Sequence, residues 1–142
     1  MKTDSLSLRD LVDVRAHGRC EYCRRYKVLL GETFFEVEHI FPRSRGGLTL
    51  PSNLAFACRR CNLFKSNVIE QVDARTGRSA PLFNPRTDSW PDHFRRSRDL
   101  RRIYGRTATG RVTVNLLQMN EATEQTTRQI QRDYLADMFP LD

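Results

Sequence analysis

The residues of this chain that could do chemistry gather in one short segment. Glu38, His39 and Asn53 precede the run Cys58-x-x-Cys61-Asn62-x-x-Lys65. An imidazole titrates close enough to neutral pH to take a proton from water. Carboxylate and amide oxygens suit a hard divalent cation, and a lysine can neutralise an anion. This combination of groups suits the hydrolysis of a phosphodiester.

The four cysteines form two pairs with metal-ligand spacing, Cys20-x-x-Cys23 and Cys58-x-x-Cys61. Two such knuckles, with no cysteine left over, predict a closed tetrahedral zinc site made of four thiolates. Arginines flank both pairs and favour the thiolate form that zinc requires. The alternatives are reduced thiols or a redox pair. A redox pair needs only one such motif, usually within a βαβ pattern that is absent here.

Hydrophobic periodicity, capping patterns and glycine or proline residues place these groups on elements of secondary structure. A helix is expected to begin at the Ser7-x-x-Asp10 pattern and to end near Gly18. Alternating polar and apolar residues predict a strand over 33–40, and the glycine- and proline-rich 41–47 a loop. The expected order continues with a short extended segment over 53–57 and a helix over 62–67, while 26–30 is either a short strand or a loop.

A longer pattern now becomes visible. Glu38-His39-Ile40-x-Pro42-x-Ser44-x-Gly46-Gly47, then Asn53-Leu54, then the second knuckle with Asn62 and Lys65 resembles the HNH endonuclease family and its ββα-metal finger. The resemblance covers about residues 20–67. Two positions depart from the most familiar pattern: Glu38 stands where Asp is common, and Asn62 stands where His is common. Both departures keep an oxygen or nitrogen donor.

The resemblance implies a role for each of these positions. His39 would be the general base that activates water, and Asn53 would orient its ring. Glu38 and Asn62 would bind a single Mg²⁺ or Mn²⁺ ion, and the products would carry 5′ phosphate and 3′ hydroxyl ends. Lys65 follows Asn62 by three residues, so it shares a helix face with it and could hold a phosphate oxygen.

Each of these residues also has a structural alternative. His39 could be a buried histidine bonded to backbone, and Glu38 a solvated carboxylate. Asn62 could cap a helix, Asn53 could form a local turn, and Lys65 could face solvent. Neighbours on a strand point to opposite faces. Glu38 and His39 can therefore share one site only if the backbone bends or the metal lies at the end of the strand.

Charge supports a polyanionic partner. The 142 residues contain 24 Lys and Arg against 17 Asp and Glu, a net charge of +7, and the pI is near 9.7. Four arginines near the motif are candidates for contacts with DNA phosphates, most simply on a duplex: Arg43, Arg45, Arg59 and Arg60. Any one of them could instead be solvated.

We therefore predict an α+β fold in which a four-cysteine zinc site supports a ββα nuclease core, with additional C-terminal helices. The expected organisation is a single domain over 1–142, with its core at 18–67 and an extension over 68–142 that contains a turn at 73–77 between two short strands. Mean hydropathy is −0.60, and neither a membrane span nor a secretory signal is apparent, so we expect a cytoplasmic protein. The predicted function is a metal-dependent endonuclease acting on DNA. The alternatives are a zinc-stabilised nucleic-acid-binding module without catalysis, and a small toxin or interaction protein whose partner masks the basic face.

Overall fold

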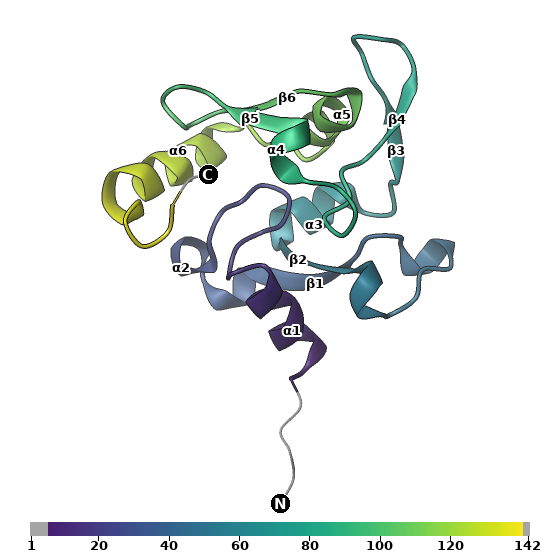
Figure 1. The fold of residues 1–142 in the computed structure, drawn as a ribbon, viewed down its shortest axis with the longest axis horizontal. Coiled ribbons are helices and arrows are strands. Elements are labelled where there is room, and N and C mark those ends of the chain that lie inside the picture. Colours follow the sequence, from purple (N-terminus) through teal and green to yellow (C-terminus); the bar gives the residue numbers. More distant parts are fainter. Residues whose placement is uncertain (1–5, 141–142) are drawn as a thin grey trace, which may run out of the picture.

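The structure is a computed structural model that describes residues 6–140 (Figure 1). Its helices are α1 (Leu8–Arg15), α2 (Lys27–Leu30), α3 (Arg59–Lys65), α4 (Trp90–His93), α5 (Ala108–Leu116) and α6 (Ala122–Ile130). Its strands are β1 (Phe35–His39), β2 (Leu54–Cys58), β3 (Glu70–Val72), β4 (Ser79–Pro81), β5 (Phe94–Arg96) and β6 (Ile103–Gly105). Short turns of 3-10 helix cover Glu32–Phe34, Arg43–Arg45 and Pro51–Asn53, and a π-helical turn, Gln131–Leu135, continues α6.

An antiparallel hairpin of β1 and β2 forms the centre of the N-terminal half, with Val37 opposite Phe56. One face carries Phe35 and Phe56, whose rings stack at 4.9 Å, and helix α1 lies against it. The other face carries Ala55 and Ala57, whose small side chains let α3 pack closely. The predicted order of strand, loop, strand and helix is confirmed.

Local signals located two of the helices and missed a third. Ser7 caps α1, because its hydroxyl accepts a hydrogen bond of 3.0 Å from the Asp10 amide, as predicted. Helix α3 begins at Arg59, three residues earlier than expected. The segment expected to be a strand or a loop at 26–30 is instead the single helical turn α2, which ends at Gly31 with φ at +95°.

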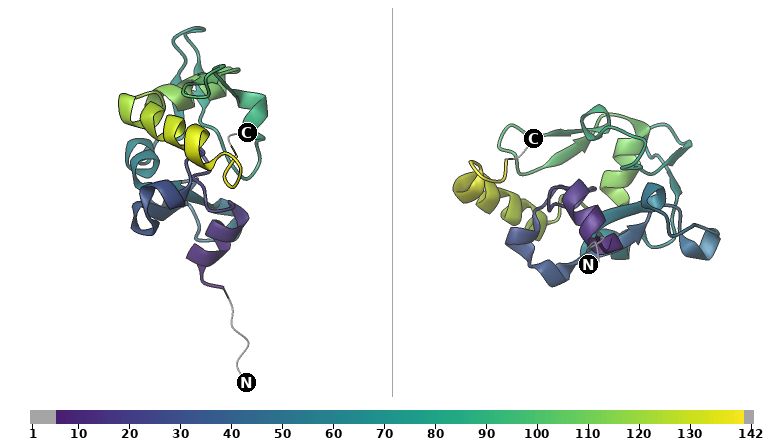
Figure 2. Two further views of the ribbon diagram at one scale, coloured as in Figure 1. Left: turned by 90° about the vertical axis from the view of Figure 1, so that its left-hand side faces the viewer. Right: turned by 60° about the horizontal axis from the view of Figure 1, so that its bottom comes forward.

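The C-terminal half consists of two further hairpins, β3–β4 and β5–β6, together with α4, α5 and α6 (Figures 1 and 2). It shares one hydrophobic core with the N-terminal finger, because Phe83, Trp90 and Phe94 belong to the same cluster as Phe35 and Phe56. The predicted α+β class, with its C-terminal helices, is confirmed. The predicted limits of the domain stay a prediction.

Helix α6 is unusual in what it buries. Its buried side chains are Glu124 and Arg128. Two apolar residues that follow α6 at helical spacing, Tyr134 and Met138, point outward. Their side chains are 80% and 75% exposed. Within residues 6–140, no helix is long and apolar enough to cross a bilayer.

Candidate active site and metal centre

The four cysteines converge at one buried point. Their sulfur atoms all lie within 4.8 Å of one another, and Cys23 Sγ is 3.8 Å from Cys58 Sγ. Zinc–sulfur bonds of about 2.3 Å in a tetrahedron place sulfurs ~3.8 Å apart, whereas a disulfide needs ~2.05 Å. The spacing and burial of the cluster therefore fit a structural zinc ion and not a pair of disulfides.

Backbone and side-chain donors surround these sulfurs. The amides of Cys23 and Cys61 lie 3.5 and 3.4 Å from Cys20 Sγ and Cys58 Sγ, the arrangement of a metal knuckle. Arg25 donates to Cys23 Sγ at 3.4 Å and to Cys58 Sγ at 3.7 Å. Burial raises the pKa of the Cys20 thiol, while hydrogen bonds from neighbouring thiols, first Cys20, lower the pKa of Cys23. A cation that replaces these shared protons would stabilise all four sulfurs as thiolates.

A buried ion pair holds the glutamate of the motif. Glu38 and Lys65 are each 2% exposed, and the Lys65 ammonium lies 2.7 Å from Glu38 Oε1. The other oxygen, Oε2, accepts a hydrogen bond of 2.7 Å from the Tyr22 hydroxyl. Tyr22 lies between the two cysteines of the first knuckle. Its pKa is raised well above the usual range, first by burial and then by the Glu38 charge. The zinc knuckle and the motif glutamate are therefore in direct contact.

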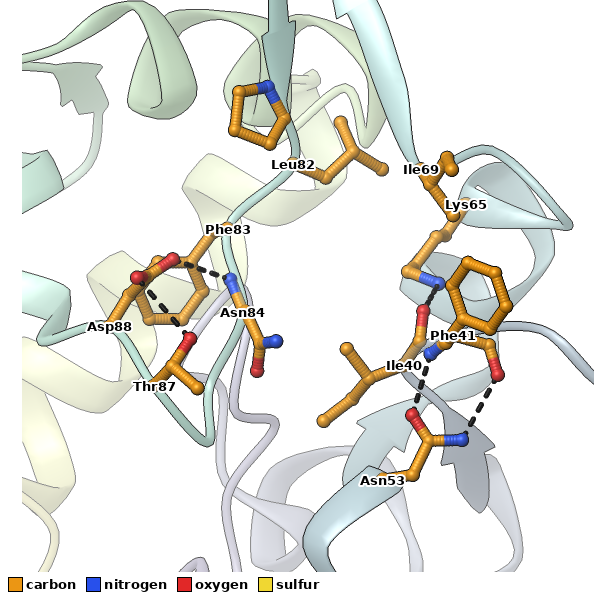
Figure 3. A pocket seen from close by; sticks show the side chains of 11 residues that line it. Ile40, Phe41, Asn53, Lys65, Ile69, Leu82, Phe83, Asn84, Thr87 and Asp88 are labelled. Carbon is orange, nitrogen blue, oxygen red and sulfur yellow. Dashed lines mark hydrogen bonds between the residues drawn. The ribbon is translucent and has the colours of Figure 1, made fainter. Parts of the chain in front are cut away.

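Lys65 faces inward, so the alternative of a solvent-facing lysine is wrong. Its ammonium also donates to the backbone carbonyl of Ile40 at 2.8 Å, a bond drawn in Figure 3. Lys65 acts here as an internal counter-ion, and its predicted contact with a phosphate oxygen stays a prediction.

His39 ends β1 and opens onto a hollow of about 320 Å³. Its Nε2 lies 2.9 Å from Thr49 Oγ1, and Nδ1 has no hydrogen-bond partner among residues 6–140. Glu38 and Asn62 line the same hollow. Because the hollow lies at the end of the strand, side chains from both strand faces reach it. The alternative of a buried histidine bonded to backbone is wrong, since the ring is partly exposed and bonded to a side chain.

Asn53 closes the loop that follows His39. Its Oδ1 accepts from the Phe41 amide at 2.8 Å, and its Nδ2 donates to the Phe41 carbonyl at 3.0 Å (Figure 3). The same Nδ2 donates to the Leu48 carbonyl at 2.9 Å. Gly47 permits this closure, because a Cβ there would lie 1.8 Å from the Phe41 carbonyl oxygen. Asn53 thus fixes the backbone next to the histidine, and the alternative of a local turn within its own segment is wrong.

Asn62 lies within α3 and does not cap it. The cap is Cys58, whose sulfur accepts from the Cys61 amide, so the capping alternative for Asn62 is wrong. The Asn62 Nδ2 donates to Glu36 Oε1 at 3.0 Å. Asn62 and Lys65, three residues apart on the helix, therefore face Glu36 and Glu38, two residues apart on β1.

The four arginines proposed for phosphate contacts divide into two groups. Arg43, Arg45 and Arg59 are exposed, and Arg45 also donates to the Asn67 carbonyl at 2.7 Å. Arg60 is only 18% exposed and pairs with the buried Glu124 at 2.9 Å. It also donates to the carbonyls at the end of α5. Arg59 also donates to the Thr33 carbonyl at 2.9 Å and lies 3.8 Å from a Glu36 carboxylate oxygen. Three of the four are thus exposed to a polyanion, while Arg60 connects the C-terminal half to α3.

Sequence reasoning missed Tyr22, Glu36 and Thr49. Tyr22 occupies one of the two variable positions between Cys20 and Cys23, and Thr49 lies in an irregular loop. Neither position belongs to a periodic pattern. Glu36 had a detectable signal, because it precedes Glu38 by two residues and so shares its strand face.

Comparison with known proteins agrees with this geometry. A search of curated proteins and a search of solved structures gave no match. A scan against protein-family models matches residues 20–67 to the family described as HNH endonuclease. This segment carries both cysteine pairs, the hairpin and α3, and its resemblance to the HNH endonuclease family is thereby confirmed.

Proposed function

We propose that this protein is a metal-dependent endonuclease that hydrolyses phosphodiester bonds in DNA, with His39 as its general base. The observation that carries this proposal is the single hollow lined by Glu38, His39 and Asn62. A basic chain of net charge +7 suits an anionic polymer. Exposed Arg43, within that lining, offers a phosphate contact beside the imidazole.

The hydrogen bonding of His39 suits a base. In the tautomer with its proton on Nε2, the ring donates to Thr49 Oγ1 and keeps a lone pair on Nδ1. That atom can take the proton of a water molecule in the hollow as the water attacks phosphorus. General-base assistance of this kind is worth roughly 10²–10⁴-fold in rate.

The donor set at the hollow fits a hard divalent cation. The Glu38 carboxylate and the Asn62 amide both line the hollow. A cation on Glu38 Oε1 would displace the Lys65 ammonium, which lies 2.7 Å from that oxygen in this structure. Mg²⁺ or Mn²⁺ on such oxygens would neutralise the phosphate and stabilise the departing 3′ oxygen. Glu38 and Asn62 are the ligands we propose.

Other side chains of the chain would hold these groups in place. Tyr22 donates to Glu38 Oε2 and so fixes the carboxylate from the side of the zinc knuckle. Glu36 accepts from the Asn62 amide and thereby orients it. Asn53 keeps the loop after the imidazole in one conformation through three hydrogen bonds to Phe41 and Leu48. Each of the proposed reacting or metal-binding residues is thus held in place by a hydrogen bond from or to a neighbouring side chain or by the loop next to it.

Cleavage of supercoiled plasmid DNA with Mg²⁺ or Mn²⁺ tests the proposal. We expect nicked and linear products from the wild type, with 5′ phosphate and 3′ hydroxyl ends. Activity should fall to background in His39→Ala, and Asn62→Ala should require far more metal. His17→Asn is the matched control, because it removes an exposed imidazole outside the site and leaves a residue that tolerates the positive φ of +56° there.

A second candidate function is the non-catalytic zinc-stabilised module that binds nucleic acid. This module makes no use of the imidazole. It therefore predicts that the wild type binds DNA without cleaving it, and that His39→Ala binds DNA equally well. Binding without cleavage under every divalent metal tested, with zinc fully loaded, would replace the nuclease proposal with this one.

A further inference from the structure

The hairpin of β3 and β4 extends beyond the rest of the molecule. It projects from the body in Figure 1 and in the left view of Figure 2. Its base packs on α5 through Ala80, Leu82 and Val112, while residues 74–79 are all exposed. Its exposed loop carries Arg75 and Arg78, whose guanidinium groups pair with no other group in the described part of the chain. We call residues 70–81 the arm.

The arm is rigidly built although it covers little of the core. Arg111 on α5 donates two hydrogen bonds of 3.0 and 2.9 Å to the Asp73 carboxylate. The Thr76 hydroxyl donates a third, of 2.9 Å, to the same carboxylate. These bonds, the one from Arg111 first, lower the pKa of Asp73 well below its usual range. Backbone bonds between Asp73 and Arg78 and between Gly77 and Asp73 close the loop. The backbone that carries the two arginines is therefore held in one conformation, which reduces the entropy lost on binding.

The arm is continuous with the candidate active site. Asn67, three residues before β3, lines the hollow that contains His39 and accepts a hydrogen bond from Arg45. In Figure 1 and in the right view of Figure 2, the arm and the loop at 43–53 lie on the same side of the molecule. At about 3.3 Å per extended residue, the eight residues from Asn67 to Arg75 span at most ~26 Å. That is about three quarters of the ~34 Å turn of B-form DNA.

We propose that the arm is a DNA-docking element that enters the groove next to the scissile phosphate, with Arg75 and Arg78 on backbone phosphates. A two-stranded ribbon has the width of the major groove, and the exposed Val72 offers an apolar contact beside the two charges. This inference rests on the proposed function for its partner, but its contacts are made away from the reacting atoms.

The test measures binding and not cleavage. The His39→Ala protein, without divalent metal, is titrated onto a labelled duplex of about three helical turns (~30 bp) across a range of salt concentrations. Each phosphate contact contributes ~0.9 to the slope of log K against log salt. We expect Arg75→Gln/Arg78→Gln to reduce that slope by ~1.8.

A matched pair on the other basic hairpin controls for net charge. Arg98 and Arg102 are also exposed, and the β5–β6 loop that holds them points to the opposite end of the molecule (Figure 1). Arg98→Gln/Arg102→Gln should leave the slope unchanged. Asp73→Asn should weaken binding while keeping the slope, because it loosens the arm and removes neither arginine.

Two results would overturn the inference: an unchanged slope in the Arg75/Arg78 pair, or an equal reduction in both pairs, which would mean that only net charge matters. Failure of the proposed function looks different, because a protein that binds DNA through the arm but never cuts it would keep the predicted slopes.

Discussion

Replacing Lys65 by methionine should strongly destabilise the fold. Methionine keeps most of the length of the lysine side chain and removes its charge. The Glu38 carboxylate, 2% exposed, would then keep only the Tyr22 hydroxyl as a partner. The Ile40 carbonyl would also lose its donor. The variant therefore leaves an uncompensated charge inside the protein.

The magnitude follows from that burial. Removing one partner of a buried ion pair costs about 3–5 kcal/mol. At ~2–4 °C per kcal/mol for a chain of this size, the melting temperature should fall by roughly 10 °C. The loss is a large share of the ~5–15 kcal/mol that stabilises a typical domain.

The assay is chemical and thermal unfolding at a fixed zinc concentration, with bound zinc measured in each sample, since zinc itself shifts the unfolding equilibrium. The double variant Glu38→Gln/Lys65→Met should recover part of the loss, because a neutral amide is cheaper to bury than a lone carboxylate. Lys27→Met is the matched control. Lys27 pairs with Asp13 near the surface, where its side chain is 32% exposed, and such a pair is worth only ~0–1 kcal/mol.

A loss in Lys65→Met no larger than in Lys27→Met would refute the reasoning, because it would mean that the motif glutamate is hydrated or protonated in the folded protein. A double variant less stable than the single one would refute the charge argument while leaving the packing intact.

Four further changes test the supports of the site. Tyr22→Phe should cost ~1–3 kcal/mol by leaving Glu38 Oε2 unpaired, and should weaken Mn²⁺ binding measured by calorimetry, whereas a purely structural tyrosine would leave that affinity unchanged. Asn53→Ala should expose the loop after the imidazole to proteases and speed amide exchange at its turn; full protection would contradict the loop-closing role. Thr49→Val should lower kcat roughly 2- to 12-fold, the equivalent of ~0.5–1.5 kcal/mol, with zinc content unchanged. Cys61→Ser, like removal of zinc by a chelator, should unfold the finger as followed by circular dichroism, and a chelated protein that keeps its native spectrum would count against a structural zinc.

Short-range features of this fold were predictable because their determinants are adjacent in the chain. The two cysteine knuckles need only a fixed spacing, and the start of α1 needs only Ser7 before an amphipathic run. The turn at 73–77 between two short strands was predictable from its glycine. Gly77 adopts a positive φ of +72° there.

Longer-range pairings could not be predicted. Lysine is almost never fully buried without a partner, so the inward position of Lys65 follows only once α3 packs on the alanine face of the hairpin and meets Glu38. Glu38 and Tyr22 are 16 residues apart and come from elements with no shared periodicity. The four residues of α2 include one β-branched residue, Val28, and two leucines, so local propensity did not distinguish a helical turn from a short strand.

Glu124 is the one carboxylate shared by Arg25, beside the cysteine sulfurs, and Arg60, in α3. A ribosome that adds about 5–20 residues per second incorporates the last of the four cysteines, Cys61, roughly 3–13 s before it incorporates Glu124. In that interval the nascent finger can capture its metal while both guanidinium groups still face water. Once α6 folds, Glu124 pairs with both arginines and covers the four-cysteine site. Exchange of a bound zinc ion in the finished protein should therefore be much slower than its first uptake.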